Sequence, residues 1–198
     1  MKDKWDERYA QSEYVYGTEP NEFVKESLKD INTGRILFLG EGEGRNAVYA
    51  ATLGWKVDAV DYSSSGKAKA ESLAKQHAVE INYMLSDLAD FSPEKESYDA
   101  IVLVYIHLPI ELREKVHSKV IQSLKRGGVI ILEAFEKEQI KNTSGGPKNI
   151  DLLYSLEDVF TDFQDLDVKV FSKEKVVLRE GALHEGNADV VRYLGVKP

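Results

Sequence analysis

The sequence Ile36-Leu37-Phe38-Leu39-Gly40-Glu41-Gly42-Glu43-Gly44-Arg45-Asn46 decides the fold of this chain. Its apolar start predicts a buried strand, and the alternating glycines predict a tight turn. A helix of about ten residues is expected to begin near Arg45, and residues 56–61 predict the next strand. These elements form a β-α-β unit whose glycine turn lies where an open parallel sheet binds its ligand.

The alternation of helix and strand continues beyond this unit. Ser63 is expected to cap an alanine-rich helix that ends near His77, and strands are expected at 81–85 and 98–105. A helix over 109–124 is expected to stop at Gly127-Gly128, before another buried strand at 129–132. Such alternation predicts right-handed crossovers and a parallel sheet with helices on both faces.

The last part of the chain follows a different pattern. Ser155 and Asp158 resemble a capping box and predict the start of a short helix. Residues 166–178 and 188–196 predict two strands joined by a short loop that carries glycine, hence an antiparallel hairpin. We therefore predict an α/β fold: a doubly wound, mainly parallel, seven-stranded sheet with a C-terminal antiparallel hairpin.

The length of 198 residues favours a single domain over 1–198. Residues 1–21 are rich in aromatic and polar side chains and show no sustained period, so we expect an arm or lid there. Pro20 is expected in the first turn of a helix that ends at Asn32-Thr33-Gly34.

The composition excludes several classes of protein. Hydrophobic residues make up 42% of the chain, which is too much for a disordered protein. The net charge of −8 disfavours nucleic acid and anionic membranes as partners, and no apolar run approaches a membrane span. The absence of cysteine removes disulfides and cysteine nucleophiles and fits a reducing, cytoplasmic location. The start of the chain shows no pattern of an export signal.

The glycine turn and two acidic residues are the candidate ligand contacts. The dinucleotide motif Gly-x-Gly-x-x-Gly would need glycine at the position of Arg45, so the spacing favours a ligand other than a pyrophosphate. Asp61 ends the second strand about 20 residues after the first glycine, where a carboxylate accepts both hydroxyls of a ribose; a helix cap is the alternative. Asp87 follows the third strand and is read either as an adenine contact or as a turn aspartate.

These residues resemble the class I S-adenosylmethionine-dependent methyltransferases. The resemblance rests on the glycine motif, on Val57-Asp58-Ala59-Val60-Asp61-Tyr62-Ser63, on Tyr98-Asp99-Ala100-Ile101-Val102 and on Leu124-Lys125-Arg126-Gly127-Gly128. A likeness to the small bacterial branch near the tellurite-resistance and thiopurine methyltransferases is carried by Trp5-Asp6-Glu7-Arg8-Tyr9, Tyr14-Val15-Tyr16-Gly17-Thr18-Glu19-Pro20-Asn21, His107-Leu108-Pro109, Gly145-Gly146-Pro147 and Glu180-Gly181-Ala182-Leu183-His184-Glu185-Gly186.

The resemblance implies S-adenosylmethionine as cofactor and no metal. It implies that residues 35–134 form the cofactor-binding core and that residues 151–198 lie on the substrate side. The cofactor contacts that it implies are Gly40, Glu41, Gly42, Gly44, Asn46, Asp61, Tyr62, Ser63, Asp87 and Leu88. Many members carry an acidic residue where this chain has Phe38, so Glu41 is expected to contact the cofactor's amino group instead.

Two of the four histidines are candidates for a catalytic base. His107 follows the fourth strand and His184 lies in the hairpin loop, so both are expected at the ligand edge, although each could be an ordinary loop histidine. His77 and His117 are read as structural.

Aromatic and charged residues near the expected site have competing interpretations. Tyr14 and Tyr16 are expected either to close over the ligands or to pack against the first helix, and Tyr105 is expected to contact substrate. The run that begins at Arg113 and the acids near Asp162 are expected to be solvated.

The sequence thus predicts an enzyme that transfers a methyl group from S-adenosylmethionine to a small-molecule acceptor. The acceptor atom (oxygen, nitrogen, sulfur or a metalloid) and the oligomeric state stay open. Two alternatives share the fold: a nicotinamide-dependent oxidoreductase, which Arg45 disfavours, and a non-catalytic S-adenosylmethionine-binding protein. A methyltransferase acting on a macromolecule is disfavoured by the acidic charge.

Overall fold

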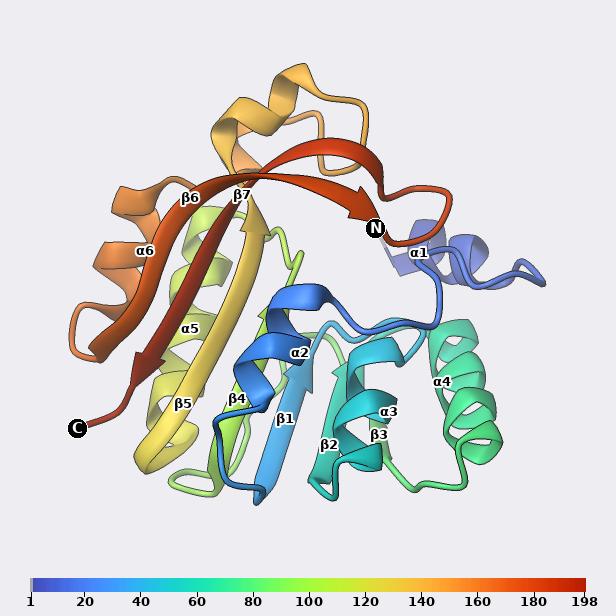
Figure 1. Cartoon of the computed structure of the whole chain (residues 1–198), viewed down its shortest axis with the longest axis horizontal. Coiled ribbons are helices and arrows are strands. Elements are labelled where there is room, and N and C mark those ends of the chain that lie inside the picture. The colour runs from blue at the N-terminus through green and yellow to red at the C-terminus, as the bar shows by residue number, and fades with distance from the viewer. Residues whose placement is uncertain (1) are drawn as a thin grey trace.

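A computed structural model describes residues 2–198, with side chains from Trp5 onward, and shows one seven-stranded sheet in the order β3-β2-β1-β4-β5-β7-β6 (Figure 1). The strands are β1 Arg35–Leu39, β2 Lys56–Asp61, β3 Asn82–Leu85, β4 Tyr98–Val104, β5 Leu124–Phe135, β6 Asp167–Arg179 and β7 Glu185–Val196. β1 to β5 pair in parallel, whereas β7 is antiparallel to both β5 and β6. The predicted fold class is confirmed.

Helices cover both faces of the sheet (Figure 1). They are α1 Lys2–Tyr9, α2 Glu22–Leu28, α3 Arg45–Thr52, α4 Ser64–Gln76, α5 Ile110–Ser123 and α6 Leu156–Phe163, with short 3-10 helices at Lys137–Lys141 (η1) and Ile150–Leu152 (η2). In β1, Ile36 and Phe38 pack in one core with residues of α2, α3 and α4, while Leu37 and Leu39 pack in the other with residues of α5 and α6. Because successive strand residues face opposite sides, an unbroken apolar run is what a sheet buried on both faces requires.

The hairpin direction decides which loops meet at the site. Since β7 is antiparallel to both of its neighbours, β6 runs in the same direction as β5. The loop between β6 and β7, which holds His184, therefore opens at the carboxyl edge of the parallel strands.

The N-terminal segment contains a helix, α1, although it lacks a sustained apolar period, and its role as an arm or lid stays a prediction. Two local expectations were wrong. Asn21 caps α2 by accepting a hydrogen bond from the Val24 amide, so Pro20 lies before the cap and the helix already ends at Leu28. α5 ends at Ser123, and Gly127 and Gly128 lie inside β5, where the register against β4 shifts.

Arg113 and Asp162 were expected in solvated surfaces, and this was also wrong. The side chains of Arg113 and Asp162 are 5% and 3% exposed, and Nε of Arg113 donates to Asp162 Oδ2 at 2.9 Å. The same carboxylate oxygen lies 2.7 Å from Nδ1 of buried His117. This cluster ties α5 to α6, because Arg113 and His117 lie on α5 and Asp162 lies on α6.

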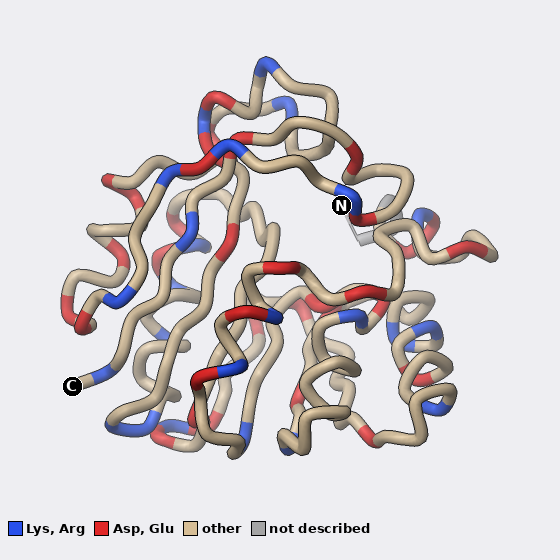
Figure 2. The backbone as a smooth tube through the Cα atoms, viewed as in Figure 1, with Lys and Arg blue, Asp and Glu red and all other residues tan. Residues whose placement is uncertain are grey.

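Charged residues of both signs are distributed along the chain, as Figure 2 shows. None of the helices in residues 2–198 is long and apolar enough to cross a lipid bilayer. The absence of nucleic-acid and membrane partners and the cytoplasmic location remain predictions.

Replacing Asp162 by asparagine should lower the free energy of unfolding by about 1–3 kcal/mol, because the buried Arg113 guanidinium would lose the closer of its two carboxylate partners and keep only Asp158, at 3.3 Å. Urea unfolding of the two proteins measures the difference. Exposed Asp165 offers a matched control, and its change to asparagine should stay within about 0.5 kcal/mol of the parent. Equal losses for both variants would contradict a stabilising role of this cluster.

Candidate active site

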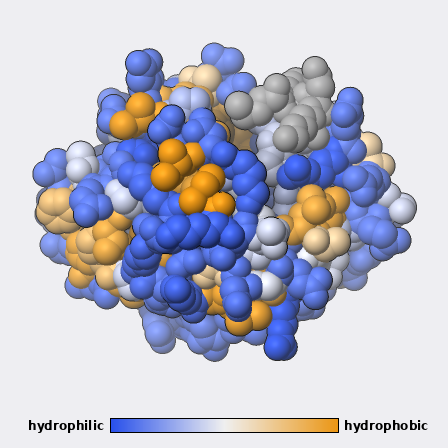
Figure 3. All heavy atoms as spheres, turned by 90° about the horizontal axis from the view of Figure 1, so that it is seen from above, coloured by the Kyte–Doolittle hydropathy of each residue, from blue (hydrophilic) through white to orange (hydrophobic). Residues whose placement is uncertain are grey.

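A cavity of about 400 Å³ lies at the carboxyl edge of the parallel strands. Its walls come from α1, the glycine turn, the ends of β2 and β4, the loop after β5 and the hairpin loop. Figure 3 looks down on this edge and shows hydrophobic patches separated by hydrophilic side chains. The cavity therefore collects residues that are far apart in the sequence, as expected where the strand order reverses between β1 and β4.

The glycine turn depends on left-handed backbone. Gly40, Gly42 and Gly44 have φ angles of 57°, 61° and 90°, a region that other residues rarely adopt. A Cβ on Gly42 would lie 2.6 Å from the hydroxyl of Tyr9, and one on Gly44 would lie 2.5 Å from Cβ of Ala70. Both backbone angle and close packing thus require glycine at Gly42 and Gly44.

Asp61 lies at the end of β2, is 8% exposed and lines the cavity. Its oxygens accept backbone hydrogen bonds from Gly42 at 3.1 Å and from Ser63 at 2.9 Å. Burial raises the pKa of Asp61, while these two hydrogen bonds oppose the shift. A carboxylate has about four acceptor positions, so Asp61 can hold the turn and still accept from a ribose.

The position where an acidic residue would be expected holds Phe38, and Glu41 supplies a carboxyl group instead. Phe38 is fully buried in the core, whereas Glu41 lines the cavity and accepts hydrogen bonds from the Asn46 and Ala47 amides at 2.9 and 2.8 Å. Burial raises the pKa of Glu41 to about 7, against the effect of those two amides and of Arg45. A nearby ligand ammonium group would favour the charged form of this carboxyl.

The structure brings together most of the expected cofactor contacts. The cavity is lined by Gly40, Glu41, Asn46, Asp61, Tyr62 and Leu88, while Gly42, Gly44 and Ser63 shape the loops behind them. Ser63 caps α4 by accepting from the Gly66 amide. Asp87 lies outside the lining and is exposed, and its carboxylate accepts from the Ala89 amide, which is the turn geometry of the alternative interpretation. Its adenine contact stays a prediction.

His107 is held in one tautomer. Its Nδ1 lies 2.7 Å from the carbonyl oxygen of Leu152, and because a carbonyl only accepts, this nitrogen carries the proton. Nε2 is therefore the lone-pair nitrogen, and it is buried without a partner among the described residues. Burial lowers the pKa of His107 to about 4, so the ring is neutral at physiological pH.

His184 has a different electrostatic setting. Its Nδ1 lies 3.5 Å from Glu180 Oε2, and its ring centroid is 4.4 Å from Tyr16 and 4.7 Å from Tyr105. Burial lowers the pKa of His184, whereas the Glu180 carboxylate opposes that shift. Burial also disfavours charge on Glu180, but His184 and the guanidinium of Arg45 outweigh it and lower the pKa of Glu180 to about 2.

The three tyrosines have different positions. Tyr16 and Tyr105 line the cavity, as expected. Tyr14 does not: its ring packs with Val48 and Leu73, and its hydroxyl donates to the carbonyl of Lys69. Packing is thus the role of Tyr14, against α4 rather than against the first helix.

Two residues that sequence reasoning missed hold the arm in place. The Glu43 carboxylate accepts from the Val15 and Tyr16 amides and from Nζ of Lys69 at 2.9, 3.2 and 2.7 Å. The Asp6 carboxylate accepts from the Ser65 amide and the Ser63 hydroxyl, and these bonds lower its pKa to about 2. The signal that could have identified Glu43 from the sequence is its acidic side chain between two glycines of the turn.

Asn21 is a third missed residue. Its side-chain amide donates to Glu133 at 2.6 Å and to Glu180 at 2.9 Å, and its backbone amide donates to Asn46 Oδ1 at 2.8 Å. The hydroxyl of Tyr105 donates to the same Glu133 carboxylate. Asn21 thus joins α3, β5 and the hairpin loop.

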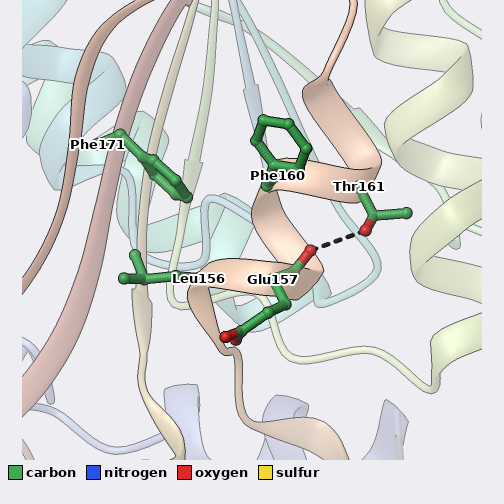
Figure 4. A pocket seen from close by; sticks show the side chains of 5 residues that line it. All are labelled: Leu156, Glu157, Phe160, Thr161 and Phe171. Carbon is green, nitrogen blue, oxygen red and sulfur yellow. Dashed lines mark hydrogen bonds between the residues drawn. The ribbon is translucent and has the colours of Figure 1, made fainter.

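A second hollow lies between α6 and β6 (Figure 4). It is lined by Leu156, Glu157, Phe160, Thr161 and Phe171. The Thr161 hydroxyl already donates a hydrogen bond to the Glu157 carbonyl. Exposed rings of Phe160 and Phe171 form its walls. Since its polar groups do not converge on a ligand position, we assign the functional site to the carboxyl-edge cavity.

Comparisons with known proteins agree with this geometry. A family model described as a methyltransferase domain matches residues 36–128, from β1 to the glycines in β5. These 93 of the 198 residues resemble the class I S-adenosylmethionine-dependent methyltransferases. The crystal structure of TehB from Haemophilus influenzae has a TM-score of 0.74 at 18% identity and covers 100% of this chain and 67% of that chain. The crystal structure of the N-methyltransferase NodS from Bradyrhizobium japonicum in complex with S-adenosylhomocysteine has a TM-score of 0.72 at 14% identity. The match covers 100% of this chain and 98% of that chain.

Curated relatives match this chain over part of its length. A ubiquinone biosynthesis O-methyltransferase from Rickettsia canadensis is 27% identical over 116 residues, which cover 59% of this chain and 49% of that protein. The probable S-adenosylmethionine-dependent methyltransferase TehB of Haemophilus influenzae is 29% identical over 102 residues, which cover 52% of this chain and 35% of that protein. The chain thus spans about half or less of these relatives. These matches favour a methyltransferase over the nicotinamide-dependent alternative.

Metal ligands were not expected in this chain. In the part of the chain that the structure describes, no group of three or more His, Asp or Glu side chains is placed to hold a metal ion. Catalysis without a metal remains a prediction.

Changing Asp61 to alanine should weaken binding of S-adenosylhomocysteine by about 1–3 kcal/mol, because the ligand and the glycine turn would both lose a charged acceptor. Titration calorimetry measures the affinity, and exposed Asp90 changed to alanine serves as control. Undiminished affinity in a folded variant would remove Asp61 from the binding site.

Changing Gly42 to valine should abolish binding of S-adenosylhomocysteine, since valine resists a φ of 61° and its Cβ would meet Tyr9. The matched control is Gly54→Val, which has a φ of 91° but no atom within 4 Å of the added Cβ. The control should lose stability and keep its affinity. Equal affinities for the two variants would show that the glycine turn does not cradle the ligand.

Proposed function

We propose that this protein transfers a methyl group from S-adenosylmethionine to a small-molecule acceptor. The observation that carries the proposal is one cavity of about 400 Å³ that joins the glycine turn to His107 and His184. This volume is near the lower end for ligand pockets, and the cofactor would share it with the acceptor. A small acceptor fits that space better than a macromolecule.

The cavity residues suit the cofactor chemically. Asp61 offers acceptors for a ribose, Tyr62 and Leu88 offer apolar surface, and Glu41 offers a carboxyl for an ammonium group. S-adenosylmethionine supplies a methyl group on a positively charged sulfur, so alignment with the attacking atom provides much of the rate.

His184 is the better general base of the two histidines. A base becomes positively charged when it accepts the acceptor's proton, and the Glu180 carboxylate beside Nδ1 stabilises that charge. Nε2 of His184 is then the nitrogen that takes the proton. His107 has no carboxylate partner among the described residues, and its Nε2 lone pair serves to accept a hydrogen bond that orients the acceptor.

Glu180 and His184 therefore act as a charge-stabilising carboxylate and a base, 3.5 Å apart and without a hydrogen bond between them in the described residues. Arg45 and Asn21 fix Glu180 at 2.8 and 2.9 Å, so the carboxylate cannot rotate freely away from the imidazole. The neutral His184 that burial favours is the form that can accept a proton.

Changing His184 to alanine should lower turnover by about 10²–10⁴ and leave S-adenosylhomocysteine affinity nearly unchanged. Because burial lowers the pKa of His184, the wild-type rate should hold on acidification through about pH 6.5 and fall only at lower pH. Glu180→Gln removes the charge that supports the imidazolium, so the acid limb should move to still lower pH as turnover falls. Release of S-adenosylhomocysteine, with an acceptor found by screening thiols, phenols and amines, measures these rates.

The matched variant is His107→Ala. It should raise KM for the acceptor more than it lowers kcat, because His107 orients the acceptor without taking its proton. Turnover within about threefold of wild type for both alanine variants would show that alignment alone suffices and that neither histidine is the base.

A further inference from the structure

Arg45 has an unsatisfied donor beside the cavity. The residue is 6% exposed and lines the cavity, and its Nη2 donates to Glu180 Oε2 at 2.8 Å. Its Nη1 is buried and has no hydrogen-bond partner among the described residues. Leaving a charged donor in this state costs free energy, so a buried orphan of this kind calls for a partner that the free chain does not provide.

The position of Arg45 places that partner on the acceptor side. Glu180 Oε2 contacts both Nη2 of Arg45 and, at 3.5 Å, Nδ1 of His184. One carboxylate oxygen therefore separates the guanidinium from the imidazole. The ribose contact, Asp61, instead lies at the end of β2 and holds the Gly42 and Ser63 amides.

The second arginine in the lining is less suited to this role. Nη1 of Arg8 donates to the hydroxyl of Tyr16 at 2.7 Å, and its guanidinium lies 4.4 Å from the ring centroid of Trp5. Arg8 is only half-buried, so water can satisfy its other donors. Arg45 is thus the guanidinium whose free donor is shielded from water.

Flat rings form the neighbouring wall of the cavity. Tyr105 stacks on Phe135 with ring centroids 4.4 Å apart and planes 16° apart. His107 stacks on the same Phe135 at 5.6 Å and 14°. Phe135 is already covered by these two rings, so a planar apolar body would pack against the cavity side of Tyr105 and His107.

We propose that Nη1 of Arg45 binds a carboxylate of the methyl acceptor, and that the acceptors are small aromatic acids. The inference rests on the proposed function. The carboxylate receives charge-assisted hydrogen bonds from Nη1, and the ring lies toward Tyr105 and His107. The acceptor's nucleophilic atom is then on the side of His184, which shares Glu180 with Arg45.

The test uses ligand pairs that differ only in charge. The full chain is first titrated with S-adenosylhomocysteine; the saturated protein is then titrated with benzoate and benzamide, and with the acid and amide of phenylacetate and 3-phenylpropionate. Wild type should bind at least one acid about tenfold or more tightly than its amide, as expected for a hydrogen bond to a charged group.

Variants of Arg45 and Glu180 distinguish the effect of the free Nη1 donor of Arg45 from that of the ion pair between the two residues. Arg45→Gln should abolish the preference for acids while S-adenosylhomocysteine affinity stays within about twofold. Glu180→Gln should keep or increase the preference, because it removes a competing carboxylate and leaves the guanidinium. Since Arg45→Gln leaves Glu180 buried and unpaired, the double variant Arg45→Gln/Glu180→Gln tests the same loss with a neutral pair.

Arg35→Gln is the matched control. Arg35 also donates to a buried carboxylate, Asp58, at 2.8 Å, but it lies at the opposite end of β1. This variant should keep both the preference for acids and the cofactor affinity.

Three outcomes would overturn the proposal or its basis. Equal binding of acid and amide by wild type in all three pairs would refute the acceptor class. A loss of S-adenosylhomocysteine affinity in Arg45→Gln that matches or exceeds the loss of acid affinity would assign Arg45 to the cofactor's carboxylate. Failure of wild type to bind S-adenosylhomocysteine would refute the proposed function itself, together with this inference.

Discussion

The left-handed turn after β1 is the constraint on which the rest of the site depends. Only glycine tolerates the backbone at Gly42 and Gly44 together with the contacts to Tyr9 and Ala70. The amides of Glu41, Gly42 and Gly44 are hydrogen-bonded within the fold. The two carboxylates of the turn accept hydrogen bonds from different segments. Glu41 caps the start of α3, whereas Glu43 reaches the amides of the N-terminal arm. Cofactor loop, helix and arm are consequently one unit.

Beneath the cavity, a buried polar network replaces apolar packing. Asn21 bridges Glu133 and Glu180, and these two carboxylates pair in turn with Arg192 at 2.6 Å and Arg45 at 2.8 Å. Each buried charge thus has an opposite partner, which avoids the cost of isolated charge in a poorly solvated interior. Such a network fixes relative positions, because its hydrogen bonds are lost if any one segment shifts. It holds the arm, β5 and the hairpin loop in a single arrangement.

Electrostatics distinguishes the two histidines although they share a cavity. Both rings are buried and favour the neutral form. A carbonyl fixes the proton of His107, whereas a carboxylate lies beside His184 and favours the charge that a base acquires. The carboxylate that supports His184 also holds Arg45, which couples proton transfer and acceptor binding through Glu180. The two proposed roles therefore depend on one side chain.

The sequence alone determined the sheet, the glycine turn and the edge on which the site lies, because apolar period, glycine spacing and caps act over a few residues. It also placed Asp61, His107 and His184 correctly at that edge, since the ends of parallel strands meet there. It did not reveal helix α1, the burial of Arg113 with Asp162, or the packing of Tyr14. Those outcomes, like the contacts of Asn21 and the free nitrogen of Arg45, depend on partners distant in the sequence. Only the tertiary structure decides which charges meet their partners and which donor is left for a ligand, because local pattern carries no information on long-range contacts.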